Sequence, residues 1–150
     1  MGGIGNYAAE LFGSGPLCGE AVLRAVAEAK GLRSELVPGA ATGFCSGLAR
    51  TGGPCGALLG AVLAVNMLTG RRNPEASDRS LEELHENYGR VQEVVRGFTE
   101  RFGAMDCTSL CGCDLSTPEG QKKFREGNVY TVCREFVRVA AELAENVLEE

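Results

Sequence analysis

Cysteines are the residues of this chain with the most evident chemistry, and there are seven of them. Four, Cys18, Cys55, Cys107 and Cys133, fall where the sequence predicts the start of a helix. Free backbone N–H groups and the positive end of the helix dipole favour a thiolate there, lowering a partly exposed thiol's pKa from about 8.5 toward about 7. If these helix starts converge, we expect a thiolate-favouring pocket.

Clustered thiols support two kinds of chemistry. In thiol–disulfide exchange, one thiolate attacks a disulfide and a second thiol resolves the mixed disulfide. We predict this redox activity, with Cys55 as the nucleophile and Cys18, Cys107 or Cys133 as its partner. The alternative is a metal centre, because thiolates bind zinc and iron–sulfur clusters. Its ligands would be a subset of Cys18, Cys55, Cys107, Cys113 and Cys133.

The cysteine spacing restricts these alternatives without deciding between them. The sequence has no Cys-x-x-Cys pair and so does not match a zinc ribbon. Cys111 and Cys113 form a Cys-x-Cys, whose short tether would make an internal disulfide strained and oxidising. Cys45, Cys111 and Cys113 can equally be incidental residues without a role in the site.

Other function classes have weaker support. A papain-like hydrolase needs a histidine beside its thiolate, and the single histidine, His85, is expected midway along an exposed helix. The stretch from Gly47 to Gly53 is rich in glycine but lacks the Gly-Lys-Ser/Thr ending of a phosphate-binding loop. The formal net charge of −5 argues against nucleic acid as a partner.

The length of 150 residues predicts a single domain, residues 1–150, large enough to bury a core. The N-terminal residues lack the basic and apolar regions of a signal peptide, and no segment qualifies as a transmembrane helix. We therefore expect a cytoplasmic protein that acts without a membrane. Clustered cysteines in such a compartment indicate redox chemistry or metal binding rather than structural bridges.

The helix that should organise the fold runs from about Cys55 to Leu68, where only Asn66 is clearly polar. A helix that is apolar all round is a buried helix. Its glycines and alanines form a smooth face that lets another helix come close. The preceding Gly52-Gly53 allows a sharp turn, and Pro54 suits a first helical turn.

Further helices are expected from apolar periodicity and capping residues. Residues 38–54 are expected to form a glycine-rich loop with one short helical turn, and Asp106 to cap a turn carrying Cys107. We predict an all-α bundle of five to six helices around the buried Gly/Ala-rich helix. The other helices are expected over residues 6–12, 17–30, 77 or 80–102 with a Ser80–Glu83 capping box, 118–127, and 131–148 with Thr131 as N-cap.

Apolar residues of the long helix before the cysteine cluster repeat with heptad spacing from Leu81 to Phe102. This stripe could pack inside the domain or against a second copy of the chain. A homodimer through the Leu81–Phe102 helix is therefore one expectation, and a helical interaction module is a further alternative to redox chemistry. A redox activity would also require a partner protein that supplies or accepts electrons.

Several segments, taken in order, resemble the C-GCAxxG-C-C family of redox-active proteins. The likeness extends from about residue 7 to residue 148, and Gly56 between Cys55 and Ala57 is a departure from the signature. It implies a small helical protein with redox-active or cluster-binding cysteines at 18, 55, 107 and 133, a matching cysteine at 113, and additional ones at 45 and 111. The segments that carry it are Phe12–Leu23, Cys55–Gly60, Phe102-Gly103 before Cys107, Gly112–Gly120, and Cys133.

Overall fold

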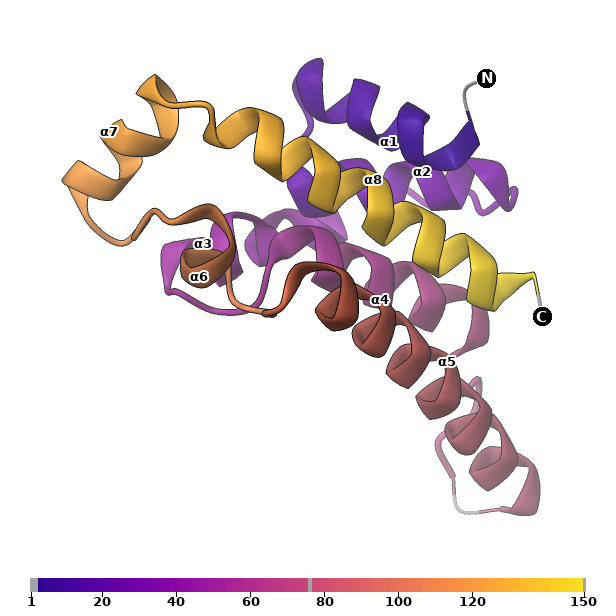
Figure 1. The fold of residues 1–150 in the computed structure, drawn as a ribbon. Helices are drawn as coiled ribbons and strands as arrows, with labels where there is room; N and C mark the ends of the chain where they lie inside the picture. The colour runs from indigo at the N-terminus through magenta and orange to yellow at the C-terminus, as the bar shows by residue number, and fades with distance from the viewer. Residues whose placement is uncertain (1–2, 76, 150) are drawn as a thin grey trace.

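The structure is a computed structural model that describes residues 3–75 and 77–149. Within those ranges the chain forms eight α-helical segments, one 3-10 helix and no β-strand, which confirms the all-α prediction. The expected five to six helices are too few, because two further segments are single turns of six and five residues. In chain order the elements are α1 (Gly3–Gly13), α2 (Cys18–Ala29), η1 (Gly39–Phe44), α3 (Cys45–Arg50), α4 (Gly56–Thr69), α5 (Asp78–Phe102), α6 (Cys107–Cys111), α7 (Pro118–Glu126) and α8 (Val129–Leu148) (Figure 1).

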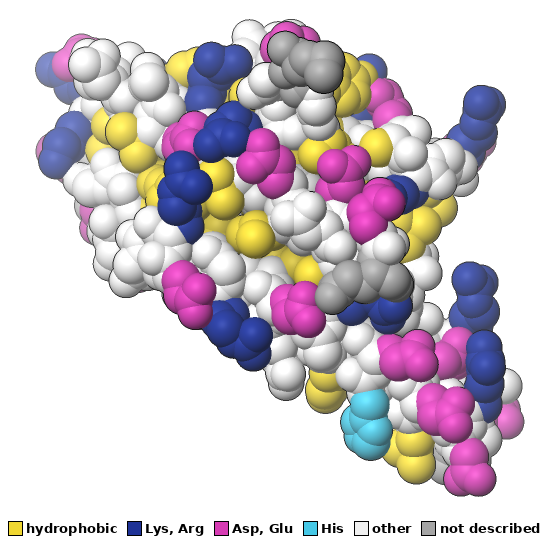
Figure 2. Space-filling model, turned by 45° about the vertical axis from the view of Figure 1, so that its right-hand side comes forward, with side chains coloured by type: hydrophobic (Ala, Val, Ile, Leu, Met, Phe, Trp, Pro, Cys, Tyr) yellow, Lys and Arg dark blue, Asp and Glu magenta, His cyan; other side chains and the backbone are white. Residues whose placement is uncertain are grey.

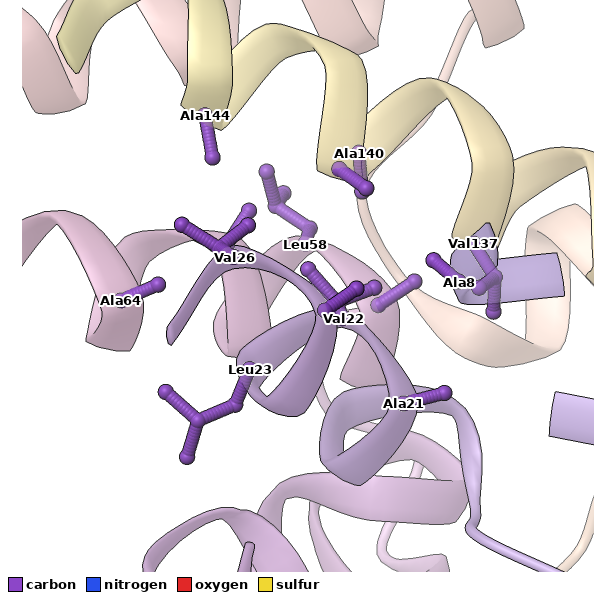
Figure 3. Packing of buried hydrophobic residues seen from close by; sticks show 14 of the residues in the cluster. Ala8, Ala21, Val22, Leu23, Val26, Leu58, Ala64, Val137, Ala140 and Ala144 are labelled. Atoms are coloured by element: carbon purple, nitrogen blue, oxygen red, sulfur yellow. The ribbon is translucent and has the colours of Figure 1, made fainter. Parts of the chain in front are cut away.

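The core lies where α1, α2, α4 and α8 pack together. Figure 3 shows its small and branched side chains, with α8 on one side and α2 and α4 on the other. Alanine and valine dominate this interface, and short side chains let helix axes approach closely. Fully buried members include Ala21, Val22, Val26, Val137 and Ala140.

The helices α2 and α4 approach most closely at two glycines. A Cβ on Gly60 would lie 2.5 Å from the carbonyl oxygen of Gly19, a distance at which a side chain cannot fit. The first turn of α2 is therefore packed against the first turns of α4. This contact brings Cys18 and Cys55, which stand at those two helix starts, to the same end of the bundle.

The helix α4 is central, as the sequence predicts, and packs against α2, α5 and α8. Its Gly and Ala positions are buried, whereas Leu59, Val62, Leu63 and Met67 are half-buried. The polar residue near its end, Asn66, is exposed at the α5 side, where its side-chain oxygen accepts a hydrogen bond of 3.0 Å from the Asn87 amide.

The helix α5 is divided between core and solvent. Its C-terminal part packs into the core through Phe98 and Phe102, which contact Phe136 of α8. Its N-terminal part projects from the bundle, and Figure 2 shows charged side chains of both signs gathered over the projection. Leu81 and Tyr88 of the heptad stripe are 51% and 55% exposed there, so this part of the stripe has no partner within the described chain.

Three predicted helix starts can be compared with the observed ones. The helix expected from residue 118 begins there as α7, and Thr117 caps it, because its Oγ1 accepts a hydrogen bond of 2.9 Å from the Gly120 amide. The N-cap of α5 is Ser77 and not Ser80, so the predicted Ser80–Glu83 capping box is wrong. The N-cap of α8 is Asn128 and not Thr131.

None of the described helices combines the length and the apolarity that crossing a bilayer requires.

Candidate functional site

The helices α3, α6 and α7 and the start of α8 lie at one end of the bundle (Figure 1). Residues of these elements line a cavity of about 320 Å³. Its wall also includes the turn before α2 and the start of α4. Five cysteines line this one cavity, and they come from α2, the N-cap of α4, α6 and α8. They are Cys18, Cys55, Cys107, Cys111 and Cys133.

The starts of α4 and α6 are tied together by the backbone. The amide of Cys55 donates a hydrogen bond of 2.7 Å to the Met105 carbonyl, and the amide of Cys107 donates one of 2.9 Å to the Gly53 carbonyl. These two bonds flank an isolated antiparallel bridge between Pro54 and Asp106. Asp106 also caps α6, because its carboxylate accepts a hydrogen bond of 2.9 Å from the Ser109 amide. The predicted Asp106 cap is therefore confirmed.

The Sγ atoms of Cys107 and Cys111, both in the cavity wall, are 3.9 Å apart. Both stand on the single turn of α6, four residues apart, and residues four apart share one face of a helix. The family resemblance implies that Cys111 is an additional cysteine, yet it lies in the cavity wall. The spacing between Cys107 and Cys111 was the signal that could have placed it in the site.

A second thiol contact lies behind the cavity wall, between Cys18 and Cys45. Hydrogen bonding with Cys18 and burial raise the pKa of the Cys45 thiol, against the lowering effect of the Glu20 and Gly19 amides at the start of α2. Glycine makes room for both residues, since a Cβ on Gly56 would lie 2.5 Å from the Cys18 Sγ and 2.8 Å from the Cys45 Cα. Cys45 therefore contacts a cysteine of the cavity wall, which the sequence did not indicate.

Cys113, predicted as an alternative metal ligand, is buried beside Cys111 and is not part of the cavity wall. Its Sγ donates a hydrogen bond of 3.7 Å to the Cys111 carbonyl. Over residues 3–75 and 77–149, no set of three or more cysteine, histidine or acidic side chains is arranged to hold a metal ion. A metal centre would require the five cavity cysteines to rearrange.

The structure does not make the pocket thiolate-favouring, and this expectation is wrong. Burial raises the pKa of Cys55, although the amides of Leu58 and Ala57 at the start of α4 act in the opposite direction. Burial and repulsion from Cys111 raise the pKa of Cys107 to about 12, and burial likewise raises that of Cys133. Desolvation and the mutual repulsion of neighbouring thiolates therefore outweigh the helix ends.

The helix starts themselves explain part of this result. Cys18 and Cys107 are the first residues of α2 and α6, and Cys55 is the N-cap of α4 rather than a residue of its first turn. Cys133 is different, because α8 begins at Val129 and the cysteine lies in its second turn. The predicted first-turn position of Cys133 is therefore wrong, and its thiol gains no benefit from free amides.

A left-handed turn forms one side of the site. Ser46, Gly47, Leu48, Ala49 and Arg50 all have positive φ, from +57° to +71°, so α3 winds in the left-handed sense. This conformation costs roughly 1–2 kcal/mol per non-glycine residue. It brings the Gly47 backbone against α6, where a Cβ would lie 2.5 Å from the Cys107 Cβ. The predicted short helical turn in this loop is present as η1, followed by this unpredicted left-handed turn.

Aromatic side chains complete the wall. The rings of Phe12 and Tyr130 are stacked with centroids 4.8 Å apart, and this pair joins α1 to the start of α8. Phe124 and Phe136 line the cavity from α7 and α8. The single histidine, His85, is exposed on α5 and is not part of the wall, so it offers no base to the thiols.

Comparison with protein families assigns most of the chain to one family. Residues 17–147 match the model of the family described as "Putative redox-active protein (C_GCAxxG_C_C)". The chain belongs to this family. The match spans all seven cysteines and nearly every element of the C_GCAxxG_C_C fold described above. No curated protein and no solved structure matches the chain.

Proposed function

We propose that this C_GCAxxG_C_C protein performs thiol–disulfide exchange and that Cys107 and Cys111 are its exchanging pair. The observation that carries the proposal is the 3.9 Å separation of their Sγ atoms in the wall of a cavity. A disulfide bond is about 2.05 Å long, so the sulfurs need to approach by roughly 2 Å. Both residues belong to one short turn, so small rotations of their side chains can bring the two sulfurs to bonding distance.

The exchange balances in two steps. A thiolate of the pair attacks one sulfur of an incoming disulfide, forming a mixed disulfide and releasing the first substrate thiolate, which takes up a proton. The second thiol of the pair loses its proton and attacks the protein sulfur of the mixed disulfide. The protein disulfide forms and the second substrate thiol leaves, so two electrons and two protons pass from protein to substrate.

Cys55 is a second candidate for the attacking thiol of the same exchange reaction. It lies in the cavity wall, and the amides of Ala57 and Leu58 favour its thiolate against the effect of burial. Cys18 and Cys133 line the same cavity and are further candidate partners. A serine at the attacking position prevents any mixed disulfide, whereas a serine at the resolving position traps it.

An iron–sulfur cluster or zinc is the second candidate function. It is supported by the five cysteines that share the cavity and by the repulsion that raises the pKa of Cys107 and Cys133, which a bound cation would relieve. Against it stands the absence, in the described part of the chain, of a ready set of three ligands.

The deciding experiment counts thiols after equilibration in redox buffers. Reduced protein should show seven free thiols, and oxidised protein should show five. Tryptic peptide 102–122 carries Cys107, Cys111 and Cys113, and it should lose two hydrogens and retain one alkylatable cysteine, Cys113. Cys111→Ser should abolish this change, and Cys113→Ser should preserve it. Seven free thiols at every physiological potential would contradict the proposal, and iron with sulfide in anaerobically purified protein would favour the second candidate.

A further inference from the structure

The charge of the cavity wall differs in sign from the charge of the chain. The chain carries a formal net charge of −5, yet the wall contains no aspartate or glutamate and two arginines, Arg50 and Arg125. Within residues 3–75 and 77–149, no side chain forms an ion pair or a hydrogen bond with either guanidinium. Two free cations from separate elements therefore border the thiols.

The rest of the wall is largely apolar. Gln121 is one of its few uncharged polar side chains, and its amide nitrogen is already engaged in a hydrogen bond of 3.0 Å to the Leu115 carbonyl. A ligand would therefore find few neutral hydrogen-bonding groups apart from the thiols. The apolar residues of the wall include Phe12, Leu17, Leu110, Phe124, Tyr130 and Phe136.

The size of the cavity restricts its occupant. A volume of about 320 Å³ lies at the lower end of the range of small-molecule sites, roughly 300–1,000 Å³. An apolar cavity with a few charged groups is the usual form of a site that orients a small amphipathic molecule.

We propose that the cavity binds a small organic anion, with its carboxylate at Arg50 and Arg125 and its apolar body against the aromatic wall. This inference rests on the proposed function for its second part, which names the substrate class as an apolar disulfide that bears a carboxylate. The exchange then transfers two electrons and two protons from Cys107 and Cys111 to the substrate disulfide, which becomes a dithiol or two thiols. Arginine suits the charged end because its guanidinium pairs with carboxylates in a bidentate geometry.

The first experiment tests binding without any sulfur chemistry. Octanoate and octanamide, which have the same apolar body and differ in charge, are titrated into the reduced full-length protein by calorimetry. Octanoate should bind at least tenfold more tightly than octanamide, and its affinity should fall as salt rises. Arg125→Gln and Arg50→Gln should each reduce octanoate affinity about tenfold. Lys122→Gln is the control, because Lys122 is an exposed cation of the same helix outside the wall and its loss changes the net charge equally.

The second experiment separates this inference from the proposed function. The reduced protein is mixed with lipoate or with lipoamide, the neutral amide of the same cyclic disulfide, and its free thiols are counted. Lipoate should be reduced faster, and Arg125→Gln should remove the difference while the slower rate of lipoamide is unchanged. Octanoate binding without reduction of either disulfide would sustain the binding site and contradict the proposed function. Equal rates for both disulfides, or equal binding of octanoate and octanamide, would overturn the inference and leave the thiol exchange intact.

Discussion

Cys55 and Cys107 are joined through their backbones. The Cys55 amide donates a hydrogen bond to the carbonyl of Met105, two residues before Cys107, and the Cys107 amide donates one to the carbonyl of Gly53, two residues before Cys55. The two cysteines are 52 positions apart in sequence (107 − 55) and stand at the starts of different helices. These backbone hydrogen bonds are not broken by redox chemistry at the side chains. A thiol can change its bonding while the backbone on both sides stays fixed.

The left-handed turn should tolerate glycine and reject a side chain at Gly47. Gly47→Ala adds a Cβ 2.5 Å from the Cys107 Cβ at a residue with φ of +71°, so we expect a loss of about 2 kcal/mol in the free energy of unfolding. Ala49→Gly in the same turn removes the steric cost of positive φ at residue 49 and adds no atoms. It should raise the free energy of unfolding by about 0.5–1 kcal/mol. Urea denaturation measures both, and effects of equal sign would contradict the left-handed geometry.

Gly56 should be required for the contact between Cys18 and Cys45. Gly56→Ala places a Cβ 2.5 Å from the Cys18 Sγ, so we expect it to lower the free energy of unfolding by about 2 kcal/mol and to expose Cys45 to alkylation. Gly89→Ala is the matched control, since a Cβ there meets nothing within 4 Å in helix α5. Helix propensity should make that variant more stable by about 0.5–1 kcal/mol. Thermal or urea unfolding with mass-spectrometric alkylation checks both outcomes.

The reactivity of Cys107 should rise steeply with pH. Burial and the neighbouring Cys111 raise its pKa to about 12, so its thiolate fraction increases about tenfold per pH unit throughout the range below that value. Iodoacetamide labelling of Cys107, followed by mass spectrometry between pH 7 and 10, should show this slope. A plateau beginning near pH 8 would contradict it.

Removing Cys111 should lower the pKa of Cys107. Burial is the largest cause of the raised pKa of Cys107, and repulsion and hydrogen bonding from Cys111 come next. Cys113 contributes less. Cys111→Ala should therefore speed the labelling of Cys107 at pH 8 several-fold, and Cys113→Ala should change it little. The same pKa direction means that folding stabilises the protonated thiol, so this contribution to stability is complete below the unfolded pKa of about 8.5 and declines as pH rises toward 12.

Much of the fold could be predicted from local patterns. The apolar run after Cys55 predicted α4, and the start of α7 was predicted at residue 118, because capping and periodicity depend on neighbouring residues. The start of α8 could not be placed as well, because Asn128 and Thr131 are both of residue types found at N-caps and the observed cap, Asn128, makes no side-chain capping hydrogen bond. A one-turn difference there moved Cys133 out of the first turn.

The candidate site was less predictable than the fold. Four residues of the left-handed turn, including Leu48 and Ala49, have side chains that disfavour positive φ, so no propensity indicated it. The direction of the cysteine pKa shifts was predicted wrongly, because the burial of Cys55 and Cys107, which is the first cause of both shifts, depends on residues distant in sequence. Local sequence places a thiol at a helix end, but only packing determines how much water reaches it.

The stacked rings of Phe12 and Tyr130 should control access to the thiols. They join α1 to the start of α8 across one side of the cavity, with centroids 4.8 Å apart. Tyr130→Ala removes one ring and should increase the labelling rate of the half-buried Cys18 and Cys133 several-fold with a bulky maleimide. Tyr130→Phe keeps the ring and should leave the rates unchanged, which distinguishes the stack from the hydroxyl. If Tyr130→Ala labels at the same rate as the unsubstituted protein while remaining folded by circular dichroism, the thiols are reached by another path.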